Sequence, residues 1–151
     1  MRRICAVFLC LATVFALFSC RARYDSSRSV IEAYVLESKD GGRIYGSAAD
    51  EASREYMSPE LAMIMFGTAE LPSDFTILVN SRLDAVTELG VFRVESRDEG
   101  LRVTELASER VALLRTLSSG DGEVTVECNL VIYYFGADKN EIKKTLLRIL
   151  D

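Results

Sequence analysis

The sequence predicts an α+β domain: a small mixed three-stranded sheet, in the chain order β-β-α-β-α, packed by helices and preceded by two or three short helices. Three observations predict this fold. Two segments rich in β-branched and aromatic residues follow one another, a long segment with helical periodicity comes next, and an alternating apolar segment then leads into a final amphipathic helix. The chain has 151 residues, 49% of them hydrophobic, which is enough to bury the core of one such domain.

The first helix of the domain is predicted at residues 30–38. Ser29 and Glu32 have the spacing of a capping box, with Ser29 as the N-cap and Glu32 at position N3. One side of this helix carries Val30, Ile31, Tyr34 and Val35. The Asp40-Gly41-Gly42 segment has turn chemistry and ends it.

Two further short helices are expected before the sheet. Residues 48–56 are rich in Ala and Glu and follow Ser47, a capping residue. Ser58-Pro59-Glu60 then places Pro at a first helical position, and Gly67 is a natural helix end. The face of this second helix carries Leu61, Ile64 and Met65. Because residues 62–66 are continuously apolar, a buried strand is the alternative there.

The first two strands are predicted at Phe75–Asn80 and Val86–Glu95, close enough in the chain to form a hairpin. The second strand has apolar residues at both odd and even positions. This pattern is typical of a strand that is covered on both faces.

The rest of the chain predicts a helix, a strand and a helix. Ser96 and Glu99 have capping-box spacing, and the helix that follows runs to about Leu117. A single strand is predicted at Glu123–Phe135, with Cys128 on its wholly apolar face and therefore buried. Its buried face carries Val124, Val126, Cys128, Leu130, Ile132 and Tyr134. If this strand lies parallel to Val86–Glu95, the helix between them completes a right-handed βαβ unit.

The last helix begins after Asp138, which would be its N-cap with Glu141 at position N3. Its buried stripe is Ile142, Leu146, Ile149 and Leu150.

The chain opens with a short basic segment and an apolar run. Met1-Arg2-Arg3 precedes residues 4–18, which are apolar except for Thr13, and Arg21 follows soon after. A secretory signal peptide has a charged start and an apolar stretch of about 7–15 residues, whereas a membrane-spanning helix needs about 20. The run therefore predicts a signal peptide at residues 1–19, with an uncleaved signal anchor as the alternative.

The end of this run, Leu17-Phe18-Ser19-Cys20, resembles the lipobox of bacterial lipoproteins. In that pattern an aliphatic residue stands three positions before the cysteine, and a small residue stands just before it. The cysteine thiol then receives a diacylglyceryl group. Leu17, Ser19 and Cys20 match, and Phe18 is bulkier than the usual residue there. The resemblance implies a lipid such as palmitate on Cys20. Because residues 21–28 are polar, we expect the lipidated N-terminus and a tether in residues 20–29 and one folded domain in residues 30–151.

Composition excludes several classes of function. The chain has no histidine, which removes histidine-based triads and histidine metal ligands. Its formal net charge is -5, which argues against a nucleic-acid partner. With Cys5 and Cys10 in the signal peptide and Cys20 lipidated, Cys128 would be a free thiol in the domain and no internal disulfide is expected. No cofactor or metal site is predicted, because no phosphate loop or zinc pattern is present.

Few residues suggest chemistry, and each has a structural explanation. Cys128 could be a nucleophile but is better read as a small core residue. Glu88, Arg93 and Arg110 could hold a charged ligand group, although a Glu88–Arg110 ion pair between strand and helix is simpler.

Two acidic groups are explained in the same way. Asp121 and Glu123 are too few for a cation site, and Gly120-Asp121-Gly122 is explained by a turn. Asp138, Asn140 and Glu141 lack the spacing of a calcium loop and are explained by helix capping.

One possible partner surface is the strand edge that carries Val131, Tyr133 and Phe135. We expect the N-terminal helices to cover these side chains. If they are open, they form an aromatic patch suited to a protein partner.

Four stretches resemble the domain-of-unknown-function family 4358 of small bacterial lipoproteins. They are Met65-Phe66-Gly67, Asp74-Phe75-Thr76-Ile77, Glu88-Leu89-Gly90-Val91-Phe92-Arg93-Val94 and Glu109-Arg110-Val111-Ala112-Leu113-Leu114. The resemblance covers roughly residues 45–150 and implies the same architecture and the lipid anchor, with no activity or ligand.

These features predict a non-catalytic lipoprotein on the extracytoplasmic face of the cell membrane, held there by its N-terminal lipid. It would bind a protein or another component of the cell envelope. The alternatives are a small carboxylate-dependent hydrolase acting on envelope material, which needs two facing acids in a cleft, and a structural spacer, which needs no pocket.

Overall fold

The computed structural model describes residues 24–82 and 85–151. The elements in chain order are α2 (Ser27–Ser38), β1 (Arg43–Gly46), α3 (Pro59–Phe66), β2 (Asp74–Arg82), β3 (Ala85–Arg93), α4 (Arg97–Leu117), β4 (Asp121–Glu127), β5 (Leu130–Gly136) and α5 (Lys139–Leu150). The strands form one antiparallel sheet in the order β1-β2-β3-β5-β4. The α+β class is therefore confirmed, but the predicted mixed three-stranded sheet is wrong, because the sheet has five strands and every pairing in it is antiparallel.

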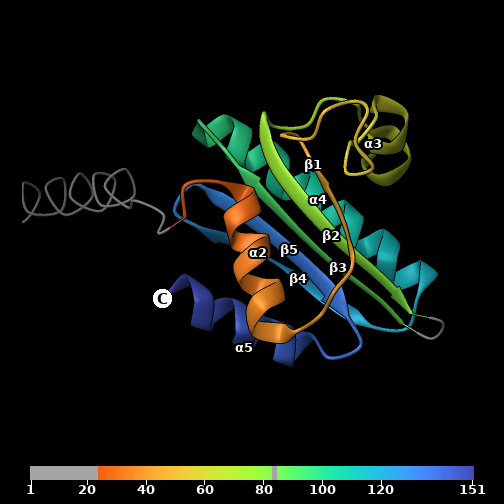
Figure 1. Ribbon diagram of the computed structural model, residues 1–151, viewed down its shortest axis with the longest axis vertical. Helices are drawn as coiled ribbons and strands as arrows, with labels where there is room; N and C mark the ends of the chain where they lie inside the picture. Colours follow the sequence, from red (N-terminus) through yellow and green to blue (C-terminus); the bar gives the residue numbers. More distant parts are fainter. Residues whose placement is uncertain (1–23, 83–84) are drawn as a thin grey trace, which may run out of the picture.

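Helices cover both faces of this sheet (Figure 1). On one face, α3 and α4 pack against even-numbered residues of β3 and odd-numbered residues of β5, such as Phe92 and Tyr133. On the other face, α2 and α5 pack against the alternate residues, such as Leu89 and Ile132. The sequence predicted that the strand Val86–Glu95 is covered on both faces. It is, and each face belongs to a separate core on its own side of the sheet.

The predicted strand Glu123–Phe135 is wrong as a single strand. It is a hairpin of β4 and β5, broken at Cys128, whose backbone has a positive φ of 55°. Because a non-glycine residue in this conformation reverses the chain rather than extending it, residues 128 and 129 form the turn. Cys128 is partly exposed at this turn and is not in the core as predicted.

The predicted βαβ unit is present in a split form. β3 and β4 both run antiparallel to β5, so they are parallel to one another with β5 between them. The helix α4 connects these two parallel strands across one face of the sheet (Figure 1).

The segment before α3 differs from the prediction. β1 pairs with β2 at the edge of the sheet, and the sequence did not indicate it. Residues 48–56 contain turns and no helix, with Gly46 bridged to Tyr56. The segment therefore folds back on β1 instead of forming the predicted amphipathic helix.

The domain begins earlier than the predicted boundary at residue 30. Ser26 is the N-cap of α2 and forms a capping box with Ser29, so the helix starts at Ser27. The hydroxyl of Tyr24 donates to the carbonyl oxygen of Ile149 (2.9 Å). Residues 24–29 therefore belong to the folded domain and not to a tether. The predicted signal peptide, residues 1–19, and Cys20 lie outside the described residues.

The other predicted helix starts are confirmed, but the predicted face of α3 is wrong at Ile64, which is 76% exposed. Ser58 caps α3, which ends at Gly67 with a φ of 71°, so the strand alternative for residues 62–66 is wrong. Ser96 caps α4, and Asp138 caps α5. Over the described ranges, no helix combines the length and apolarity needed to cross a bilayer.

Candidate functional site

A buried ion pair joins the centre of the sheet to α4. Two of the three guanidinium nitrogens of Arg110, Nε and Nη2, donate to the carboxylate of Glu88, at 2.8 and 2.7 Å. The hydroxyl of Tyr133 donates to the same carboxylate at 2.6 Å. The predicted Glu88–Arg110 pair is therefore confirmed, and Tyr133 is a third member that the sequence did not indicate.

Arg110 also ties α3 into this network. Its Nη1 donates to the carbonyl oxygen of Met65 (3.2 Å), and its guanidinium carbon lies 5.9 Å from the ring centroid of Phe66. The ring of Phe66 makes edge contacts with Phe92 and Tyr133. One arginine therefore contacts a strand, a neighbouring helix and an aromatic cluster.

Burial and charge shift the pKa values of this network. Burial raises the pKa of Tyr133 well above its ordinary value, and the negative charge of Glu88 raises it further. For Arg110, burial lowers the pKa, but hydrogen bonding to Glu88 and its charge outweigh this and the pKa is raised. Glu88 is 1% exposed and Tyr133 is 0% exposed, so a ligand in solvent has no access to either. The network holds the fold and is not a binding site.

Arg93 is not part of this group. It lies five positions after Glu88 on β3, and successive side chains of a strand point to opposite faces. Its guanidinium donates to the carbonyl oxygen of Asp25, beside the start of α2. The predicted trio is therefore split between the two faces of the sheet.

The predicted partner surface is buried. Val131, Tyr133 and Phe135 are each 0% exposed and lie in the core under α3 and α4. The open-patch alternative is therefore wrong. The expectation that the N-terminal helices cover these residues is only partly right, because α2 covers the opposite face.

Asp121 and Glu123 are held by cations of neighbouring elements. Asp121 pairs with Arg115 and with Lys139, and Glu123 pairs with Lys143 at 2.9 Å. The hydrogen bond from Lys139 is the first cause of a strongly lowered pKa of Asp121, and the bond from Arg115 is the second. Among the described residues, no group of three or more potential ligands could hold a metal ion. These carboxylates therefore fasten α4, β4 and α5 together.

Cys128 is disulfide-bonded, and the described ranges contain no other cysteine. The prediction of a free, buried thiol without a disulfide is therefore wrong. The other cysteines are Cys5, Cys10 and Cys20, so a disulfide of Cys128 within the chain and a cleaved chain with lipid on Cys20 exclude one another.

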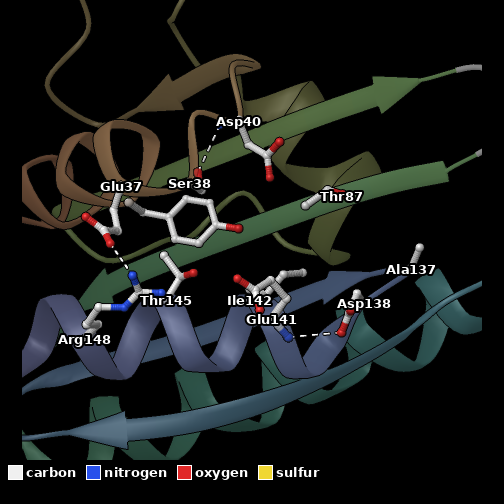
Figure 2. Close-up of a pocket in the computed structure, with 11 residues that line it drawn as sticks. Glu37, Ser38, Asp40, Thr87, Ala137, Asp138, Glu141, Ile142, Thr145 and Arg148 are labelled. Atoms are coloured by element: carbon white, nitrogen blue, oxygen red, sulfur yellow. Dashed lines mark hydrogen bonds and ion pairs between the residues drawn. The ribbon is translucent and has the colours of Figure 1, made fainter.

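A pocket lies between the end of α2 and the start of α5, with a volume of about 300 Å³ (Figure 2). Glu37, Ser38 and Asp40 line the side formed by the end of α2, and Asp138 and Glu141 line the side formed by the start of α5. The other lining residues are Tyr34, Thr87, Ala137, Ile142, Thr145 and Arg148. Four carboxylates against one guanidinium make the pocket strongly acidic.

Two of the hydroxyl-bearing residues that line the pocket, Tyr34 and Thr145, are buried. Tyr34 is 1% exposed, and burial raises its pKa to about 12, with the negative charge of Asp40 adding to the effect. A hydrogen bond with Ser38 lowers this pKa, and the charge of Glu141 raises it. Thr145 is 4% exposed and has no side-chain hydrogen bond within the described ranges (Figure 2).

The sequence did not indicate this pocket. The sequence explains Asp138 and Glu141 by helix capping. This capping is observed, because the backbone N–H of Glu141 donates to the carboxylate of Asp138 at 3.0 Å. The opposite side of the pocket lies about a hundred positions earlier in the chain. Only the packing of α2 beside α5 brings these residues together.

Compared with protein-family models, curated proteins and solved structures, the chain matches none of them.

Proposed function

We propose that the chain is a lipoprotein of the extracytoplasmic membrane face, anchored by lipid on Cys20, and that its folded domain is a non-catalytic binding or accessory protein of the cell envelope. The observation that carries this proposal is the sequence Leu17-Phe18-Ser19-Cys20 at the end of a 15-residue apolar run, residues 4–18. The resemblance to small bacterial lipoproteins of family 4358 belongs to the same proposal.

The start of the folded domain is compatible with this anchor. Tyr24, the first described residue, is only four positions after Cys20. Four residues span at most about 14 Å when extended. A lipid on Cys20 would therefore hold the domain directly at the membrane surface.

The charges of the domain support a binding role over catalysis. The acidic groups with the strongest ion pairs, Asp121 and Glu123, have lowered pKa values, whereas a general acid needs a raised one. Glu88, the most buried carboxylate among the described residues, is closed to solvent. The pocket beside α2 favours binding over the spacer alternative.

Metabolic labelling with a fatty-acid analogue tests the anchor. The native chain should be labelled and should fractionate with membranes, and Cys20→Ala should abolish labelling. Cys10→Ala is the matched control because it removes another cysteine of the N-terminal segment, and its labelling should be unchanged. Full labelling of the Cys20→Ala chain contradicts the proposal.

The hydrolase alternative rests on one observation, the presence of Asp40 and Glu141 in the same pocket. It predicts that the purified chain releases reducing ends from isolated cell-wall glycan and that Glu141→Gln removes this activity. Absence of any release by the native chain excludes it.

A further inference from the structure

The pocket between α2 and α5 has an excess of negative charge that the described residues do not neutralise. Glu37 is paired with Arg148, whereas Asp40, Asp138 and Glu141 have no ion pair within the described ranges. Lys139 and Lys143 are engaged elsewhere by Asp121 and Glu123. Lys39 and Lys144 adjoin lining residues in the sequence, but neither lines the pocket or forms an ion pair with its carboxylates. The charge of the pocket therefore favours a cationic occupant over a neutral or anionic one.

The backbone at the pocket adds to this preference. The last turn of α2, which includes Glu37 and Ser38, ends at the pocket and contains no basic residue. The carboxyl end of a helix carries partial negative charge and is stabilised by cations. The cationic residue nearest this helix end in the sequence is its C-cap, Lys39, which does not line the pocket.

The side chain of Thr145 is an independent sign of a ligand. It lines the pocket, it is nine-tenths buried, and its hydroxyl has no hydrogen-bond partner within the described ranges. Its oxygen is not among the fully buried side-chain atoms that lack a partner, so it remains accessible at the pocket, where a ligand can donate a hydrogen bond to it.

The distribution of polar and apolar lining residues indicates the shape of the cation. Carboxylates stand on both sides of the pocket, with Asp40 after α2 and Asp138 and Glu141 at the start of α5 (Figure 2). Ala137 and Ile142 supply apolar surface in the same pocket. A bare metal ion does not fit, because no group of metal ligands is found among the described residues.

We propose that this pocket binds a linear aliphatic diamine or polyamine, with one ammonium group at Asp40, a second at Asp138 and Glu141, and the methylene chain against Ile142. Ammonium groups donate only, which suits carboxylates and the hydroxyl of Thr145. The proposal rests on the binding role proposed above and is independent of the lipid on Cys20.

Isothermal titration of the full chain in detergent with cadaverine tests the proposal. Cadaverine should bind at least tenfold more tightly than 1-aminopentane, which has one ammonium group, and 1,5-pentanediol should not bind. Equal affinity for the two amines, or no heat with millimolar cadaverine, overturns it. The Cys20→Ala chain should bind cadaverine equally well, so that failure of the anchor and failure of the pocket can be told apart.

Two variants localise the binding. Asp40→Asn should weaken cadaverine binding at least tenfold, whereas Asp98→Asn, an equal charge change at the exposed start of α4, should leave it unchanged. Equal weakening by both variants means unspecific charge attraction and refutes the site.

Thr145→Val separates a ligand role from a structural one. Valine keeps the shape and removes the unpaired hydroxyl, so the variant should melt at the same or a higher temperature and bind cadaverine more weakly. Unchanged binding contradicts the proposed position of the ligand.

Discussion

At the scale of residues, the buried pair of Glu88 and Arg110 defines how the sheet and α4 fit together. Its desolvation is offset by two hydrogen bonds between the partners and by a third from Tyr133. A buried pair of this kind adds little net stability over an apolar replacement, but leaving one charge alone is costly. The pair therefore constrains which arrangement of helix and sheet is tolerated.

A double-mutant cycle tests this view. Arg110→Met should lower the free energy of unfolding by about 3–5 kcal/mol because it leaves the Glu88 carboxylate buried without a counter-charge. Glu88→Gln combined with Arg110→Met should recover most of this loss, as measured by urea denaturation. If the double variant is as unstable as Arg110→Met alone, the cost is lost packing and not an unpaired charge.

Gly90 is needed because the ring of Tyr133 lies across it. A Cβ atom at residue 90 would be 2.0 Å from Cε1 of that ring, which is far inside van der Waals contact. We expect Gly90→Ala to cost about 1–3 kcal/mol of stability through overpacking. Gly41→Ala is the control, since nothing lies within 4 Å of its added Cβ, and its urea midpoint should stay near that of the native chain.

At the scale of elements, ion pairs at Asp121 and Glu123 join helices to the β4 edge of the sheet. Arg115 reaches Asp121 from α4, and Lys139 reaches it from α5. Because these side chains are partly exposed, each pair is a weak contact, but together they connect elements on opposite faces of the sheet.

The lowered pKa of Asp121 predicts a pH dependence of stability. A carboxyl whose pKa is lower in the folded state contributes stability above its ordinary pKa of 3.8, and this contribution is lost as the pH falls below that value. At pH 7 the native chain should melt at a higher temperature than Asp121→Asn, and the difference should shrink below pH 3.8. Glu51→Gln, in an exposed turn, should show no such difference. A difference for Asp121→Asn that is constant with pH contradicts the role of this charge.

At the scale of the whole molecule, the sheet has two unlike ends. One end holds Tyr24 and the start of α2, and the end of α2 and the start of α5 lie toward the opposite end (Figure 1). The acidic pocket extends along α5 from Asp138 at its start to Arg148, next to Ile149. The helix α5 connects the two ends over 12 residues, or about 18 Å. If Cys20 carries lipid, the start of α5, with Asp138 and Glu141, lies on the side away from the membrane.

Fluorescence quenching tests this orientation. A fluorophore on Glu95→Cys, just after β3, should be quenched by spin-labelled lipid headgroups, and one on Asn140→Cys, in the first turn of α5, should be quenched much less. Both positions are exposed, so attachment should not disturb the core. Equal quenching at both positions would falsify the proposed orientation.

The sequence by itself determined most of the local structure. Helix starts at Ser58, Ser96 and Asp138 and the end of α3 at Gly67 depend on hydrogen bonds and backbone angles within a few residues, and such signals are legible in the chain. The Glu88–Arg110 pair was also foreseeable, because a charged residue in an apolar strand needs a partner from the next helix.

Only the tertiary structure decided what depends on distant neighbours. The break at Cys128 carries no glycine or proline signal, and pairing of β4 with β5 places it in a turn. The coverage of Val131, Tyr133 and Phe135 and the acidic pocket follow from which helix lies on which face of the sheet. Periodicity indicates that a face is buried but not what buries it, since that depends on contacts between segments far apart in the chain.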